Sequence, residues 1–110
     1  MPPGLSEPLD EDCPPAPVPD GALVRELRIV NKKGLHARAS AKFVQTVERF
    51  GSDVAVTRCG ETVGGRSIMG LLTLAAAQGT LITVTALGDD ARACLDGIEA
   101  LVSGRFGEED

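Results

Sequence analysis

The sequence of residues 80–104, TLITVTALGDDARACLDGIEALVSG, joins two segments of different periodicity and decides the fold class. Residues 80–87 are rich in β-branched side chains, which favours a strand. The Gly-Asp-Asp run at 88–90 is typical of a helix start, and Gly104 is typical of a helix end. Between them apolar residues recur three and four positions apart, as in a helix that buries one face: Ala91, Cys94, Leu95, Ile98, Leu101 and Val102.

The rest of the chain supplies three more strands and two more helices. The same criteria predict strands over 23–30, 53–58 and 61–65, a helix over 37–50, and a short helix capped by Ser67 and closed by Gly79. The helix over 37–50 is expected to bury a stripe formed by Ala37, Ala41, Val44 and Val47.

This order, βαββαβα, predicts an α+β fold. Its form is a two-layer open-faced β-sandwich, in which a four-stranded antiparallel sheet carries three helices on one face. A ferredoxin-like small-molecule regulatory domain has a similar number of elements and is the alternative.

Proline and charge divide the 110 residues into three parts. All seven prolines and five acids lie in residues 1–20, which contain no Lys or Arg, so this segment is expected to be a disordered leader. It lacks the basic residues of targeting peptides and the apolar run of a secretory signal. Residues 21–105 are the expected domain, and 106–110 an acidic tail.

The net charge of −5 conceals a basic body, because residues 21–107 hold 11 basic and 8 acidic side chains. Such a body is attracted to acidic protein surfaces. Its weak charge, with three Phe, no Trp and no Tyr in the chain, argues against nucleic acid. No apolar run reaches the ~20 residues of a membrane span.

The three cysteines, Cys13, Cys59 and Cys94, include no Cys-x-x-Cys pair. They therefore predict neither a zinc site nor a disulfide framework. Cys94 lies on the apolar face of the last helix and is expected in the core. A reducing cytoplasm fits this pattern best.

The only histidine, His36, stands in Gly34-Leu35-His36-Ala37-Arg38-Ala39-Ser40, where a predicted strand and turn give way to a helix. Free backbone N–H groups and the positive end of the helix dipole make such a place suited to an anion. An imidazole there can carry a phosphoryl group, with Arg38 pairing its oxygens. A surface or capping histidine is the alternative.

Gly34-Leu35-His36-Ala37-Arg38 resembles the active-site signature of the HPr family, the phosphocarrier proteins of the phosphotransferase system. Ser67 lies 31 residues after His36, and Arg66-Ser67-Ile68-Met69-Gly70 resembles the family's second signature. The likeness extends from about Leu23 to Val102. It implies the same open-faced fold and a phosphoryl group held without cofactor or metal.

The resemblance also implies the function. Enzyme I would pass a phosphoryl group from phosphoenolpyruvate to His36, with Arg38 as its partner, and a IIA-type protein would accept it. The chain would be a stoichiometric relay and not an enzyme, and is expected to be a monomer. Ala39 stands where the family commonly has Pro, which favours a nitrogen-related regulatory branch over sugar transport.

The second signature resembles the form recognised by an HPr kinase/phosphorylase, which implies regulatory phosphorylation of Ser67; a plain helix cap is the alternative. Ile68, Met69 and Leu72 are expected to form an apolar patch that contacts partners. The alternative is that these residues are half-buried parts of the core. For the whole chain, the alternative function is a purely regulatory module whose partners depend on its phosphorylation state. The downstream pathway is left open.

Overall fold

The structure is a computed structural model that describes residues 13–108. Four strands and three helices follow in the predicted order, with a short 3-10 helix after the last of them. They are β1 (Leu23–Arg28), α1 (Ala37–Val47), β2 (Asp53–Arg58), β3 (Glu61–Gly64), α2 (Ile68–Thr73), β4 (Leu81–Leu87), α3 (Ala91–Ser103) and η2 (Arg105–Gly107).

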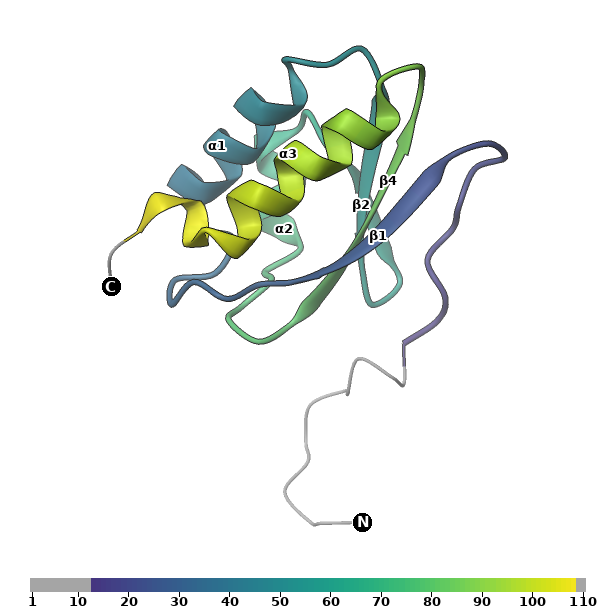
Figure 1. Ribbon diagram of the computed structural model, residues 1–110. Coiled ribbons are helices and arrows are strands. Elements are labelled where there is room, and N and C mark those ends of the chain that lie inside the picture. The colour runs from purple at the N-terminus through teal and green to yellow at the C-terminus, as the bar shows by residue number, and fades with distance from the viewer. Residues whose placement is uncertain (1–12, 109–110) are drawn as a thin grey trace.

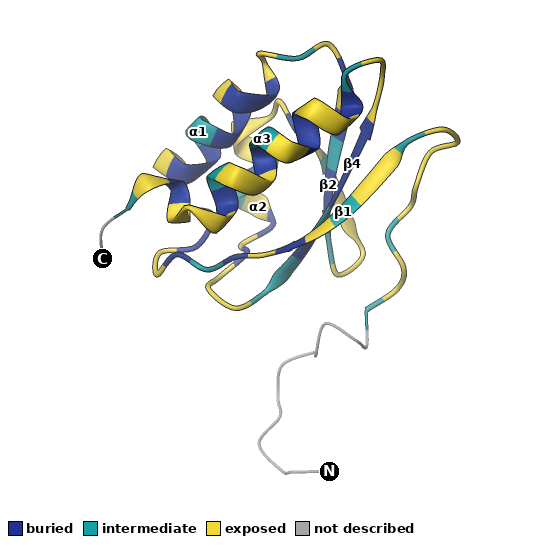
Figure 2. Cartoon of the chain, in the orientation of Figure 1, coloured by how far each residue is buried: buried dark blue, intermediate teal, exposed yellow. Residues whose placement is uncertain are grey.

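The four strands form one antiparallel sheet in the order β1-β4-β2-β3. All three helices lie on one face of it, so the predicted α+β sandwich is confirmed (Figure 1). Alternation along β4 buries Ile82, Val84 and Ala86 beneath the helices, whereas Thr83 lies on the other face. The inward helix faces are correspondingly buried (Figure 2).

The buried face of α1 differs from the predicted stripe. Ala37 is exposed and Ala41 only half-buried, whereas Ala39, Phe43 and Val47 are fully buried. These three residues lie four apart, and Phe43, one of the largest fully buried side chains, fixes which side of the helix faces the sheet. The predicted stripe took in the small Ala37 and Ala41 and was therefore partly wrong.

The start of α3 is stabilised differently from the expectation. Asp90 occupies the N-cap, but its side chain makes no capping bond. Its carboxylate instead accepts hydrogen bonds from Ser52 Oγ at 2.5 Å and Gly51 N at 2.9 Å. Both bonds lower the pKa of Asp90, and the bond from the Ser52 hydroxyl is the larger cause. Asp90 thus joins the α3 start to the loop between α1 and β2.

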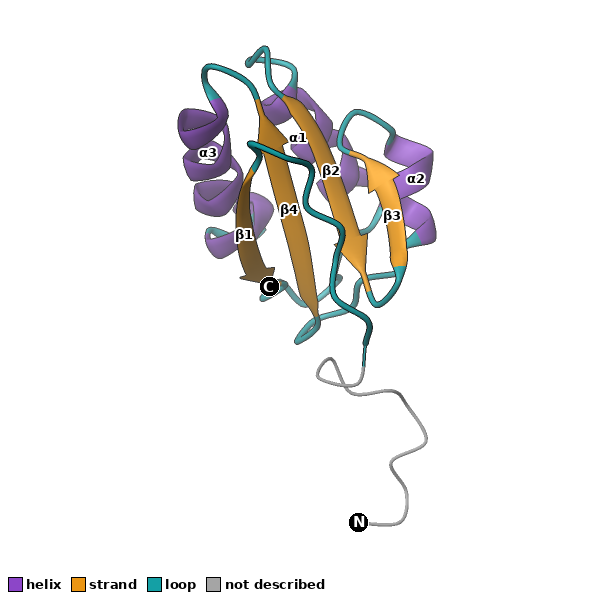
Figure 3. Cartoon of the chain, turned by 90° about the vertical axis from the view of Figure 1, so that its right-hand side faces the viewer, coloured by secondary structure: helices purple, strands orange, loops and turns teal. Residues whose placement is uncertain are grey.

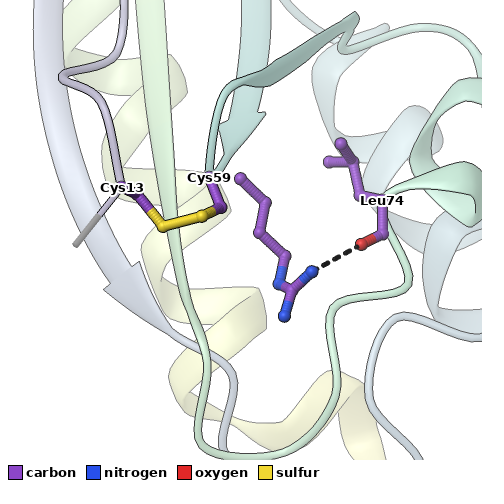
Figure 4. The surroundings of a disulfide bond; sticks show 4 residues. Cys13, Cys59 and Leu74 are labelled. Carbon is purple, nitrogen blue, oxygen red and sulfur yellow. Dashed lines mark hydrogen bonds between the residues drawn. A yellow bond between two sulfur atoms is a disulfide. The ribbon is translucent and has the colours of Figure 1, made fainter. Parts of the chain in front are cut away.

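The sheet face opposite the helices was expected to be left to water, but residues 13–18 cross it (Figure 3). The expectation of no disulfide is also wrong, because Cys13 is bonded to Cys59 across a sequence separation of 46 (Figure 4). The pairing depends on the chain folding back over the sheet, which residue spacing does not reveal. Cys94 is free and buried, as predicted.

The first 12 residues of the expected leader and the last two of the expected tail lie outside the described residues. The division into leader, domain and tail therefore stays a prediction. Within residues 13–108, no helix is long and apolar enough to cross a membrane.

Candidate functional site

The turn between β1 and α1 is held tightly against the loop that precedes β4. Leu35 N donates to Ala76 O at 2.9 Å. Gly34 has φ +67°, and a Cβ there would lie 2.5 Å from the same carbonyl oxygen, so only glycine fits without a shift. The turn therefore fixes the position of His36, which follows Leu35 at the start of α1.

His36 is the N-cap of α1, which begins at Ala37 as the sequence predicted. Its backbone is extended, with φ −78° and ψ −175°, and its carbonyl accepts the first helical bond from Ser40 N at 2.8 Å. Its side chain makes no capping bond. The N–H groups of the first helical turn, Ala37 to Ala39, have no partner within the helix. They and the helix dipole give this place an affinity for anions.

The imidazole of His36 is paired with an acid that sequence reasoning did not assign to the site. Its Nε2 lies 2.5 Å from Glu108 Oε2, and the two side chains are 27% and 15% exposed. An ionised carboxylate can only accept a hydrogen bond, so Nε2 is the donor. In the neutral ring this leaves the lone pair on Nδ1, a nucleophile at near-neutral pH.

Glu108 is held by more than the histidine. Asn31, itself fully buried, donates from Nδ2 to both carboxylate oxygens at 3.2 Å and to Gly34 O at 2.8 Å. The hydrogen bond from His36 is the largest cause that lowers the pKa of Glu108, followed by the bond from Asn31 and the charges of His36 and Lys33. The carboxylate is therefore ionised at neutral pH.

A short segment after α3 brings Glu108 to the site. Phe106 is 1% exposed and has φ +55°, and Gly107 follows with φ +78°. Lys42 of α1 donates from Nζ to Phe106 O at 2.6 Å. The buried ring thus attaches η2 to the helix layer. Phe106, just after the helix end predicted at Gly104, was the one signal in the sequence that this segment packs against the core.

Arg38, the second predicted site residue, lies on the first turn of α1. Its side chain is exposed and makes no hydrogen bond or ion pair with any of residues 13–108. It is therefore free to approach an anion at the helix start. Lys32 and Lys33 are exposed in the preceding turn and add positive charge nearby.

Comparison with known proteins assigns the chain to a family. The family model for the "PTS HPr component phosphorylation site" matches residues 23–104, which include the turn, His36 and α1. The chain belongs to the HPr family.

Individual relatives agree with this assignment. The chain is 48% identical over 86 residues to phosphocarrier protein HPr of Neisseria meningitidis, covering 78% of this chain and 97% of that one. It is 38% identical over 86 residues to phosphocarrier protein NPr of Shewanella violacea, covering 78% and 94%. The crystal structure of HPr from Thermoanaerobacter tengcongensis superposes with a TM-score of 0.77 at 38% identity, covering 80% and 99%.

Ser67 caps a different helix, α2. It is the N-cap of α2, and its exposed Oγ accepts a hydrogen bond from Gly70 N at 2.9 Å. The capping role predicted from the sequence is present. No hydrogen bond joins Ser67 to His36 among the described residues.

The predicted apolar patch divides along α2. Met69 is 71% exposed and Ile68 40% exposed, whereas Leu72 is half-buried. Leu71 and Leu74 form the part of this segment that enters the core. Two adjacent apolar side chains next to Ser67 are therefore available on the surface.

Proposed function

We propose that this protein is a histidine phosphocarrier, in which His36 accepts a phosphoryl group that enzyme I takes from phosphoenolpyruvate. It then passes the group to a IIA-type protein. The observation that carries this proposal is the pairing of His36 Nε2 with Glu108 at the start of α1. That pairing assigns the nucleophilic lone pair to Nδ1 of a ring next to unpaired helical N–H groups.

In the proposed transfer, Nδ1 attacks the phosphorus atom in line with the leaving group. The new Nδ1–P bond forms as the bond from phosphorus to the donor breaks, and the donor keeps that electron pair. The proton stays on Nε2 throughout, and the ionised Glu108 offsets the charge of the phosphorylated ring. Transfer onward reverses these steps.

Charge stabilisation comes from groups already in place. The phosphoryl oxygens would accept from the N–H groups of the first turn of α1 and from Arg38, whose guanidinium suits bidentate pairing with phosphate. The role needs no cofactor or metal, and the protein acts as a stoichiometric relay and not as an enzyme.

The surface of α2 supports proposals about partners. Ile68 and Met69, with the half-buried Leu72, would contact enzyme I and the IIA-type protein. Phosphorylation of Ser67 by an HPr kinase/phosphorylase would add about two negative charges beside this patch and weaken docking to acidic partners. We place the protein in the cytoplasm, as a monomer that binds neither nucleic acid nor membrane.

One observation favours a second role. The relatives include a phosphocarrier named NPr as well as those named HPr, and Ala39 follows Arg38 in this chain. A regulatory module in a nitrogen-related branch, whose partners depend on its phosphorylation state, would use the same His36.

The test is labelling with enzyme I and radioactive phosphoenolpyruvate. The wild type should incorporate about one acid-labile, alkali-stable phosphoryl group and lose it when a IIA-type protein is added. His36→Ala should incorporate none, while Ser67→Ala, which retains the histidine, should match the wild type. Equal labelling of His36→Ala would overturn the carrier proposal.

A further inference from the structure

Residues 13–18, here called the strap, lie across the sheet face that the helices leave uncovered (Figure 3). The strap passes over Glu26 of β1, Thr83 of β4 and Thr57 of β2. It lies outside residues 23–104, the part that matches the HPr family. The strap is therefore not part of the region that the family model matches.

Residues 14–18 of the strap make few polar contacts with the sheet. Three of its six residues are prolines, which have no N–H to donate, and residues 14–18 form no hydrogen bond with the sheet within the described chain. Val18 is 47% exposed. A cavity of about 150 Å³ remains between the strap and the sheet. Residues 14–18 are therefore not fixed to the sheet by hydrogen bonds of their own.

The disulfide from Cys13 to Cys59 attaches the strap covalently to the β2–β3 turn. Cys59 lies at the turn between β2 and β3, where it has φ +45° and Gly60 has φ +88°, as a type I′ turn requires. Cys59 is exposed and Cys13 half-buried, so an attacking thiolate can reach the bond. By contrast, Cys94 is fully buried.

We propose that Cys13 and Cys59 form a redox-sensitive clasp, which fixes the strap on the open sheet face when oxidised and releases it when reduced. In a reducing compartment the released form predominates, and oxidation closes the clasp. Disulfides in such compartments are typically transient or redox-sensing. Neither His36 nor Glu108 lines the two cavities next to the strap, so we assign the clasp to the sheet face and not to the histidine.

The reaction is thiol–disulfide exchange with a low-molecular-weight disulfide. One protein thiolate attacks a sulfur of that disulfide, forms a mixed disulfide and displaces one thiolate. The second protein thiolate then attacks the protein sulfur of the mixed disulfide and displaces the other. Two protein thiols are oxidised to one disulfide, and the small disulfide is reduced to two thiols. A dithiol reverses both steps.

The test compares the full chain after treatment with glutathione disulfide and after treatment with dithiothreitol. Backbone ¹⁵N relaxation of Ala16 and Val18 reports the strap directly. We expect order parameters of about 0.8 in the oxidised protein and below about 0.6 in the reduced protein. Mass spectrometry after alkylation should find Cys13 and Cys59 blocked only in the reduced sample.

Matched variants keep the result interpretable. Cys13→Ser and Cys59→Ser should each give the mobile strap under both treatments, whereas Cys94→Ala should respond like the wild type. The proposal is overturned if the strap has the same order parameters in both redox states. It is equally overturned if glutathione disulfide leaves Cys13 and Cys59 as thiols.

Discussion

Replacing Cys13 with serine removes the covalent link between the strap and the β2–β3 turn, and its cost can be worked out from the length of chain it closes. The bond spans a sequence separation of 46. Closing a loop of that length lowers the entropy of the unfolded chain enough to stabilise the fold by about 4.0 kcal/mol. This value applies if the strap stays docked without the bond.

If the strap instead detaches when the bond is removed, the folded state gains conformational entropy, which offsets part of this loss of stability. About ten residues separate Cys13 from the start of β1, and freeing a loop of that length returns about 2.7 kcal/mol. Release of the strap on loss of the bond, as proposed above, corresponds to this second case. The expected loss of stability is therefore about 1.4 kcal/mol, a fall in Tm of roughly 6–11 °C for a domain of this size.

Urea unfolding of the oxidised wild type, the reduced wild type and Cys13→Ser measures this loss. The last two should agree with each other and lie about 1.4 kcal/mol below the first. Cys59→Ser should match Cys13→Ser. Equal stability of the oxidised wild type and Cys13→Ser would refute the account of the disulfide. A loss near 4 kcal/mol would instead refute the statement that the strap detaches.

Four further substitutions test the site. Arg38→Ala should leave Tm unchanged, because the side chain is exposed, yet slow phosphoryl uptake from enzyme I about tenfold; equal rates would remove Arg38 from the site. Phe106→Ala should cost about 3 kcal/mol in urea unfolding, because it empties a fully buried site, and an unchanged midpoint would contradict the docking of η2. Glu108→Gln should remove part of the pH dependence of the free energy of unfolding. A carboxylate whose pKa is lowered from 4.5 on folding stabilises the fold above that value, and this stability is lost as the pH falls through the lower folded pKa. The wild type should therefore lose stability more steeply than the variant below about pH 4.5. Ser67→Asp should retain its fold but accept phosphoryl groups more slowly at low salt, with partial recovery at high salt; a salt-independent rate equal to the wild type would leave Ser67 as a cap.

Local sequence predicted the elements well where two signals agreed. Strand β4 and helix α3 lie within one residue of their expected bounds, because β-branched composition, helical periodicity and flanking glycines all pointed to the same boundaries. The phase of α1 was less well predicted, because small alanines lie on several sides of that helix and packing of Phe43 decides among them. The helix propensities of individual residues do not determine which face of α1 is buried.

Only the part of the site that depends on neighbouring residues in the sequence was predicted. The place of His36 at a helix start depends on a few adjacent residues and follows from the motif. Its contact with Glu108 joins residues 72 apart, and it depends on Phe106 entering the core with a positive φ. The Cys13–Cys59 bond likewise joins segments 46 apart. Such pairings arise from tertiary packing, which periodicity along the chain does not report.

One measurement tests directly whether His36 carries the phosphoryl group on the ring nitrogen turned away from Glu108. The protein is labelled with ¹⁵N-histidine, phosphorylated by enzyme I and examined by ³¹P and ¹⁵N NMR. We expect a single phosphohistidine whose phosphorus couples to Nδ1 of His36, while Nε2 retains its proton. Phosphorus bonded to Nε2, or to any other residue, would contradict it.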